Sequence, residues 1–179
     1  MTREQWLRGA AERLSHDLAL QGAWPLHVSV GFPRGRRGRV RPVGQCWDGA
    51  LSADRRPHVF VSPVLAEPVG VLATLLHELV HAEVGSEAHH RGAFITTSRR
   101  VGLLKPWTAT TSSEDLLCRL NALAAELGGY PHAALTEKAQ ERSVSRLRLW
   151  ECACPVKVRV ASDRFAATCD DCEAPFERA

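Results

Sequence analysis

Apolar residues recur along this chain with two periods, one typical of helices and the other typical of strands. The strongest helical stretch covers about 68–84, where leucine and valine side chains form an apolar stripe along one face. Weaker stretches of the same kind predict three further helices, at 3–20, 90–102 and 113–127. Alternation of apolar and polar residues predicts a short strand at 26–30, and the segments 43–47 and 58–62, separated by a turn-rich stretch, are expected to be two further strands.

This order of elements predicts an α+β fold with a small, mainly antiparallel sheet. A polar and charged segment at 131–147 reads as a connector, so we expect one domain over 1–147 and a second over 148–179. A chain of 179 residues is long enough for one core of about 140 residues with such an appendage. No run approaches the roughly 18 apolar residues of a membrane span. The charged, amphipathic start is unlike a secretory signal, so we expect a cytoplasmic protein.

His77 and His81 enclose Glu78 in a His-Glu-Leu-Val-His sequence near the end of the predicted helix 68–84. Positions four apart lie on one face of a helix, so both imidazoles can bind one zinc ion. Glu78 then stands beside the open coordination position, where hydrolysis of an amide needs a general base. The alternative is a pair of histidines that face solvent or satisfy core partners, and the apolar stripe beside them disfavours it. We therefore expect a catalytic zinc at His77 and His81, with Glu78 as the catalytic residue.

A catalytic zinc needs a third protein ligand, and the residues after Gly85, which should end the helix, offer several. The longer HExxHxxGxxH pattern is excluded because it needs histidine at the position of Glu87. Glu87 is itself a possible ligand, although a glutamate so close to a helix end is more often solvated. His89 and His90 remain, and spacing alone does not choose between them. Cys46 is a weaker candidate, because a cysteine beside a tryptophan on a strand is usually a buried apolar residue.

Four cysteines near the C-terminus form two pairs with fourteen residues between them. Two thiolate pairs joined by a hairpin are typical of a zinc ribbon, and the alternating segment 156–160 predicts a strand of that hairpin. A disulfide pair is the alternative, and a reducing compartment disfavours it. So small a unit holds too little apolar surface to fold without metal. The expected ligands of this structural zinc are Cys152, Cys154, Cys169 and Cys172.

The net charge of +3 says little about partners, but the distribution of arginines says more. Five arginines lie within 34–41, where glycines and a proline predict a flexible loop. Arginine forks suit phosphates, so nucleic acid is a candidate partner. The alternative is a solvated loop in a chain that prefers arginine to lysine throughout. The candidate nucleic-acid-binding residues are Arg34, Arg36, Arg37, Arg39 and Arg41.

Several of these segments resemble the SprT-like (Spartan-related) zinc metalloproteases in their short bacterial and phage form. The likeness rests on the His77–His81 motif, on 90–94, on the four cysteines and on the stretches 44–47, 62–63 and 129–135, and it covers most of 40–175. The resemblance implies a SprT-type zincin domain followed by a zinc ribbon. In that family the third zinc ligand is a histidine four residues before an aromatic residue, unlike the glutamate of gluzincins. Here that histidine is His90, before Phe94.

The resemblance also implies a function, the zinc-dependent hydrolysis of peptide bonds in proteins bound or crosslinked to DNA, as in DNA repair. We accordingly expect two Zn²⁺ ions, one catalytic and one structural, a protein or peptide substrate, DNA as a partner, no membrane and a monomer. An extended substrate would pair with the edge of the sheet, which we expect at 59–62. Tyr130 and His132 are candidates for stabilising the oxyanion.

Two alternatives stay open. One is a metallopeptidase that acts on a single specific protein, and the other is a non-catalytic zinc-ribbon protein that binds nucleic acid or the transcription machinery. Glu78 argues against the second, since nothing structural requires a carboxylate there.

Overall fold

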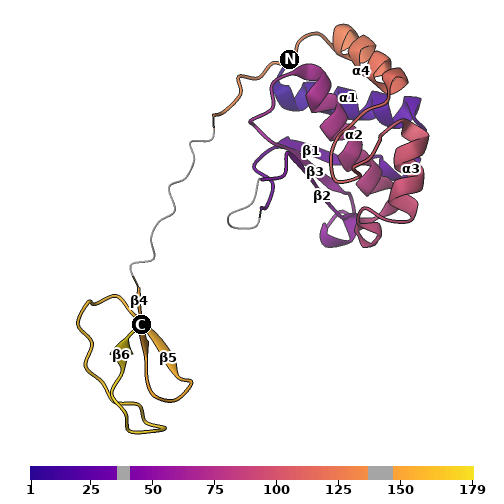
Figure 1. The fold of residues 1–179 in the computed structure, drawn as a ribbon. Coiled ribbons are helices and arrows are strands. Elements are labelled where there is room, and N and C mark those ends of the chain that lie inside the picture. The colour runs from indigo at the N-terminus through magenta and orange to yellow at the C-terminus, as the bar shows by residue number, and fades with distance from the viewer. Residues whose placement is uncertain (36–40, 137–146) are drawn as a thin grey trace. The chain divides into compact units, whose positions relative to one another are not determined.

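The computed structural model describes residues 1–35, 41–136 and 147–179. The chain forms two compact units, Met1–Thr136 and Glu137–Ala179 (Figure 1). The domain boundary expected between 147 and 148 lies next to residues 137–146, which are outside the described part, and it stays a prediction.

The first unit contains the helices and strands that the apolar pattern predicts. The ends of these elements differ from the predicted ones by three residues or fewer. In chain order the elements are α1 (Arg3–Asp17), β1 (His27–Val30), β2 (Gly44–Trp47), β3 (His58–Val61), α2 (Pro68–Val84), α3 (Ala93–Val101) and α4 (Glu114–Leu127).

The sheet of this unit has the order β1-β3-β2, with β3 in the middle. The unit combines helices with a sheet, so the α+β class is confirmed. However, β3 runs parallel to β1 and antiparallel to β2, so the sheet is mixed rather than mainly antiparallel. The prediction of an edge strand at 59–62 is wrong, because the chain inserts its third strand between the first two. Strand order depends on such long-range pairing, which alternation within a strand does not encode.

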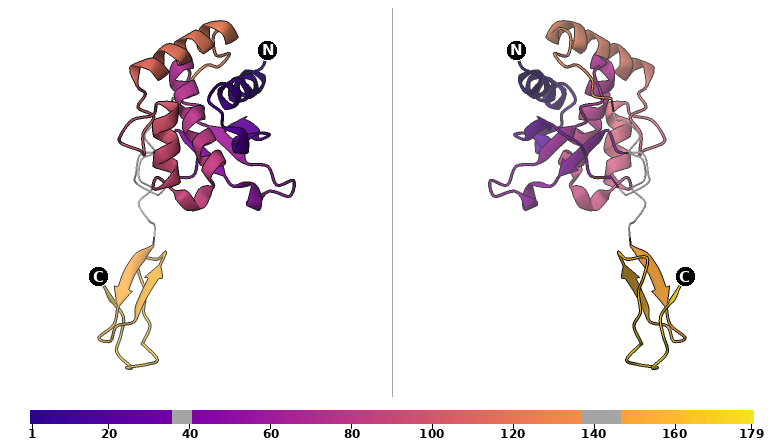
Figure 2. Two further views of the ribbon diagram at one scale, coloured as in Figure 1. Left: turned by 90° about the vertical axis from the view of Figure 1, so that its right-hand side faces the viewer. Right: turned by 90° about the vertical axis from the view of Figure 1, so that its left-hand side faces the viewer.

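Helix α2 is the centre of the first unit. All of its residues from Val71 to Val80 are buried, and it packs against β2, β3, α1, α3 and α4. Figure 2 shows α2 between the sheet and α3. The helix begins at Pro68, whose missing N–H costs nothing at a first turn, and the Glu67 carboxylate accepts bonds from the backbone N–H groups of Val69 and Gly70. The sequence therefore defines both the start and the burial of this helix.

The segment after α4 returns across the unit and closes its core. Tyr130 is buried against Trp6 of α1, with ring centroids 5.0 Å apart, and the Trp6 indole N–H donates to the Gly128 carbonyl at 3.0 Å. His132 donates through Nε2 to the carbonyl of Pro63 at 2.8 Å. These contacts attach the end of the unit to α1 and to the residues that follow β3.

The second unit contains the strands β4 (Arg148–Glu151), β5 (Lys157–Val160) and β6 (Glu177–Arg178). They form a small antiparallel sheet in the order β5-β4-β6. Trp150 packs on Phe165, which packs on Phe176, with ring centroids 5.6 and 5.9 Å apart.

None of the helices in the described residues combines the length and the apolar character needed to cross a membrane.

Because Trp150 and Cys169 are the only buried apolar residues in the described part of the second unit, we expect this unit to depend on metal for its folding. Treatment of the full chain with a strong zinc chelator should abolish slow amide hydrogen exchange over 147–179, while α1 and α2 keep theirs. Exchange measured by mass spectrometry tests this. Unchanged protection over 147–179 after complete zinc removal would contradict it.

Candidate metal centre

Three imidazoles converge at one end of α2. His77 and His81 lie one turn apart on this helix, and His90 comes from the segment between α2 and α3. The Nε2 atom of His90 lies 3.2 Å from Nε2 of His77 and 3.2 Å from Nε2 of His81. Nitrogen atoms that share one tetrahedral zinc at 2.0–2.1 Å stand about 3.3 Å apart. The donor set and its spacing therefore fit a zinc ion.

The histidines are held in the form that binds metal. Burial, with the charge of His90, lowers the pKa of His77 to about 4, and burial with neighbouring imidazoles lowers that of His81 to about 3. Burial also lowers the pKa of His90. All three rings are thus neutral at physiological pH, as coordination requires. The ring of His77 also makes a hydrogen bond to the backbone of Ala109, the kind of second contact that fixes a ligand's tautomer.

The backbone around His90 decides which of the two adjacent histidines points inward. His89 has φ 45° and ψ −126°, a conformation that residues other than glycine rarely adopt, and Gly92 has φ 49°. These two unusual residues turn the chain so that His90 joins the cluster while His89 stays exposed. The choice that spacing left open is therefore made by backbone conformation, in favour of His90.

Phe94, in the first turn of α3, forms the wall behind the three ligands. It is 1% exposed, and its ring centroid lies 5.1, 4.3 and 4.9 Å from those of His77, His81 and His90. One buried ring thus limits the movement of all three imidazoles. This contact gives a physical reason for an aromatic residue four positions after His90.

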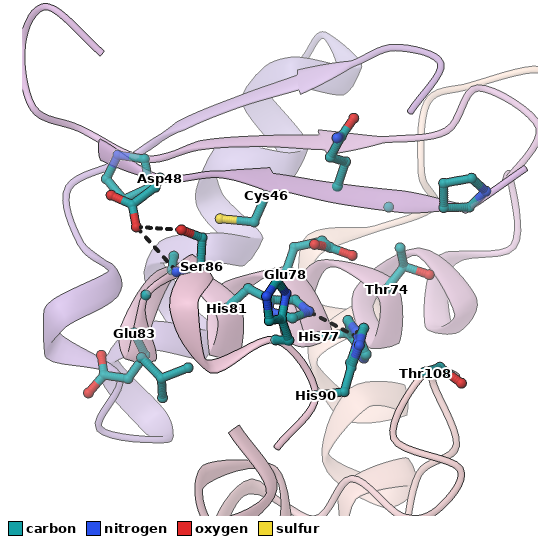
Figure 3. Close-up of a pocket in the computed structure, with 18 of the residues that line it drawn as sticks. Cys46, Asp48, Thr74, His77, Glu78, His81, Glu83, Ser86, His90 and Thr108 are labelled. Carbon is teal, nitrogen blue, oxygen red and sulfur yellow. Dashed lines mark hydrogen bonds between the residues drawn. The ribbon is translucent and has the colours of Figure 1, made fainter. Parts of the chain in front are cut away.

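Glu78 lies on the same helix as His77 and His81 but points toward β2 (Figure 3). It is 6% exposed, and burial raises its pKa to about 8, although a hydrogen bond from the backbone of Cys46 offsets part of that rise. A Cβ atom added to Gly44 would lie 2.5 Å from Oε1 of Glu78 and 2.8 Å from Thr74. Glycine is therefore needed for β2 to pass so close to this carboxyl group.

A cavity of about 1160 Å³ opens over the histidines and Glu78. Its walls come from β2, from the loop that follows β2 and from residues 108–110. Asp48, after β2, accepts bonds from the Ser86 backbone N–H and hydroxyl, both at 3.2 Å (Figure 3). The backbone N–H groups of Ala50 and Ser86 lower the pKa of Asp48. This contact joins two walls of the cavity through residues 38 positions apart in the sequence, and the sequence pattern does not predict it.

The other candidate ligands are not part of the histidine cluster. Cys46 lines the cavity, but burial and the nearby Glu78 raise the pKa of its thiol to about 12, so it stays protonated. Glu87 is exposed in the short turn before His89. Tyr130 and His132, the candidates for stabilising an oxyanion, do not line the cavity: they pack the chain end against α1 and Pro63.

The arginine run is described only at its two ends. Arg36, Arg37 and Arg39 lie outside the described residues, so the structure does not test the predicted nucleic-acid contact. The Arg34 backbone N–H donates to Gln45 at 2.9 Å, and the Arg41 guanidinium lies over the ring of Phe32, 5.5 Å from its centroid.

In the second unit the four predicted cysteines form one cluster. Two Sγ–Sγ distances, 3.6 Å for Cys154–Cys169 and 3.9 Å for Cys152–Cys172, are close to the roughly 3.8 Å of thiolates that share a zinc. The pair Cys152–Cys154 is closer, at 2.8 Å. The backbone N–H of Ala174 lowers the pKa of Cys172 to about 7, which favours a thiolate. The donor set is that of a closed structural zinc site.

Comparison with known proteins adds no relative. The chain matches no protein-family model, and no curated protein and no solved structure is significantly similar to it. The structure itself supports both metal sites expected from the sequence as candidates, one of three histidines and one of four cysteines.

The assignment of His90 rather than His89 as the third ligand can be tested with a matched pair of variants. His90→Ala should lower the zinc content by about one equivalent per chain, because two imidazoles alone hold zinc weakly. His89→Gly should keep both zinc ions and raise the free energy of unfolding by about 1 kcal/mol, since glycine adopts this backbone conformation without strain. Elemental analysis and chemical denaturation measure the two effects. Zinc loss in the His89 variant instead would contradict the assignment.

Proposed function

We propose that this chain is a zinc-dependent metallopeptidase of the SprT-like type. In this proposal His77, His81 and His90 hold the catalytic zinc, and Glu78 is the general base. The observation that supports it most directly is the position of Glu78, a buried carboxyl group beside three convergent imidazoles on the wall of an open cavity. In the described residues, no ion pair to Glu78 explains why a carboxylate should be buried there.

Glu78 is suited to moving a proton. When bound, the zinc ion supplies Lewis acidity, which polarises a peptide carbonyl and lowers the pKa of water. The Glu78 carboxylate accepts the proton of the attacking water and delivers it to the leaving nitrogen. Burial makes this carboxylate a stronger base than an exposed glutamate, and its hydrogen bond from the Cys46 backbone keeps it oriented toward the cavity. The same residue therefore acts first as base and then as acid.

The edge of the sheet suggests how a substrate would lie. In the described residues β2 pairs with β3 on one side only, and Gly44, Gln45 and Cys46 line the cavity. An extended peptide added along β2 would carry its backbone past Glu78 and the histidines. The substrate strand that sequence reasoning assigned to 59–62 thus belongs at 44–47 in this proposal.

The proposed link to DNA rests on the resemblance and on the arginine run 34–41. The second unit contributes little to it, since residues 147–179 hold five arginine or lysine side chains and six acidic ones. Lys157 pairs with Glu151, and both Arg148 and Arg178 lie within 4 Å of Asp163. A zinc ribbon with this charge balance has no excess of cations for a polyanion.

Glu78→Gln tests the catalytic role. The variant should keep both zinc ions and lose activity by about 10²–10⁴-fold, because the amide cannot accept the proton. Hydrolysis of an unfolded protein such as casein, with and without single- and double-stranded DNA, measures the effect, and a faster rate with DNA would support a DNA-directed role. Equal rates for the variant and the wild type would refute the assignment. Zinc-loaded wild type without turnover on any substrate would favour the non-catalytic alternative.

Gly44→Ala tests the close approach of β2 to the catalytic carboxyl group. The added methyl group must displace Glu78 or the strand, so we expect hydrolysis to fall by at least about tenfold while zinc content stays at the wild-type value. Gly129→Ala is the matched control, since a Cβ atom there meets nothing within 4 Å. Wild-type rates in the Gly44 variant would mean that the carboxyl group is not confined by the strand.

A further inference from the structure

A third group of metal-binding side chains lies at the end of the sheet, and none of its three residues lines the cavity. His27 is the first residue of β1 and His58 the first of β3, and the two pair in register across the parallel strands. Paired positions in neighbouring strands face the same side of a sheet. The two ring centroids accordingly lie 4.5 Å apart. Asp54, from the loop between β2 and β3, places Oδ2 2.7 Å from Nε2 of His27.

Neighbouring groups hold these donors in place. Oδ1 of Asp54 accepts bonds from the Ser52 hydroxyl at 2.6 Å and from the Arg56 backbone N–H at 3.2 Å. The hydrogen bond from Ser52, followed by those from His27 and from the Arg56 backbone, holds the pKa of Asp54 well below its usual range. The Ser52 hydroxyl also lies 3.1 Å from Nε2 of His58. Ser52 thus contacts two of the three donors, as outer groups of a metal site commonly do.

The chemistry of the donors selects a class of ion. The candidate ligand atoms of His27, Asp54 and His58 all lie within 4.8 Å of one another. Two imidazoles and one carboxylate suit Zn²⁺, Ni²⁺ or Cu²⁺, whereas Mg²⁺ and Ca²⁺ prefer sites made of oxygen alone. The side chains of His27 and Asp54 are 42% and 45% exposed, so an ion can reach them from solvent.

One cation competes for the carboxylate. Nε of Arg56 lies 3.9 Å from Oδ2 of Asp54, but the side chains of this pair are about half exposed. Such surface ion pairs contribute little, because solvent screens them and both side chains lose freedom. Arg56 should therefore weaken the binding of a divalent ion without preventing it.

The loop that carries Asp54 forms part of the cavity wall. Asp48, Gly49, Ala50, Arg55 and Pro57 all line the cavity over the histidine cluster. The Asp48 carboxylate also holds Ser86, at the start of the segment that leads to His90. An ion bound by Asp54 and by the two sheet histidines would fasten this loop to β1 and β3.

We propose that His27, Asp54 and His58 form a third, exchangeable site for a divalent transition metal, which fastens the loop 48–57 to the end of the sheet. This inference goes beyond the proposed peptidase function and does not depend on it. The site is distinct from the histidine cluster and the four cysteines, since it shares no residue with either.

Nickel binding to the zinc-loaded, desalted chain tests the site. By equilibrium dialysis the wild type should bind one further equivalent of Ni²⁺, and both His27→Ala and His58→Ala should bind it at least about tenfold more weakly. Asp54→Asn should weaken binding by removing the charge, and Arg56→Ala should tighten it. His16→Ala is the matched control, because His16 forms an exposed pair with Asp17 and belongs to no three-donor group in the described residues. Equal Ni²⁺ binding by the wild type and the doubly substituted His27→Ala, His58→Ala chain would overturn the proposal.

Two measurements on the wild type keep the test independent of how the variants fold. Cu²⁺ at substoichiometric amounts should broaden the NMR amide signals of residues 27, 54 and 58, and broadening confined to other histidines would overturn the site. Saturating Ni²⁺ should slow amide hydrogen exchange across 48–57 at least about threefold if the ion fastens the loop. Binding without any change in that exchange would overturn the fastening role.

Discussion

The burial of α2 determines the arrangement of the whole first unit. A helix covered by a sheet on one side and by other helices on the other can neither rotate nor shift without disturbing the whole core. Because its apolar residues are held in the core, His77, Glu78 and His81 on the same helix are held in place with them. Burying these polar groups costs free energy, which is visible in the lowered pKa values of the histidines and the raised pKa of the glutamate. A cation bound at this site would offset that cost and would thereby couple metal binding to the stability of the core.

The contacts around α2 explain why the site needs residues far apart in the sequence. Phe94 confines the three imidazoles, Gly44 lets β2 approach the carboxyl group, and Asp48 ties the loop after β2 to Ser86. None of these groups binds an ion or moves a proton. They position the groups to which we assign those roles, and an error of about 1 Å in such positions is enough to cost an enzyme a large part of its rate.

Much of this arrangement could be predicted from the sequence, because it is encoded locally. Helical spacing brings His77 and His81 onto one face, and the paired cysteines indicate their own cluster. The order of the strands could not be predicted, since the insertion of β3 between β1 and β2 depends on pairing between distant segments. The choice between His89 and His90 depends on an unusual backbone conformation, which the spacing of histidines along the sequence does not reveal. Tyr130 and His132 could be named only as candidates, because a polar residue after a glycine pair can equally pack a chain end against the core.

A crystal structure with anomalous data collected on both sides of the zinc absorption edge would test directly whether α2 carries a metal centre. We expect one zinc peak about 2.0–2.1 Å from the Nε2 atoms of His77, His81 and His90, with Glu78 beside its open position, and a second peak among the four cysteines. A filled cysteine site with no peak at the histidines, in crystals grown with zinc, would contradict the claim that α2 carries a catalytic metal centre.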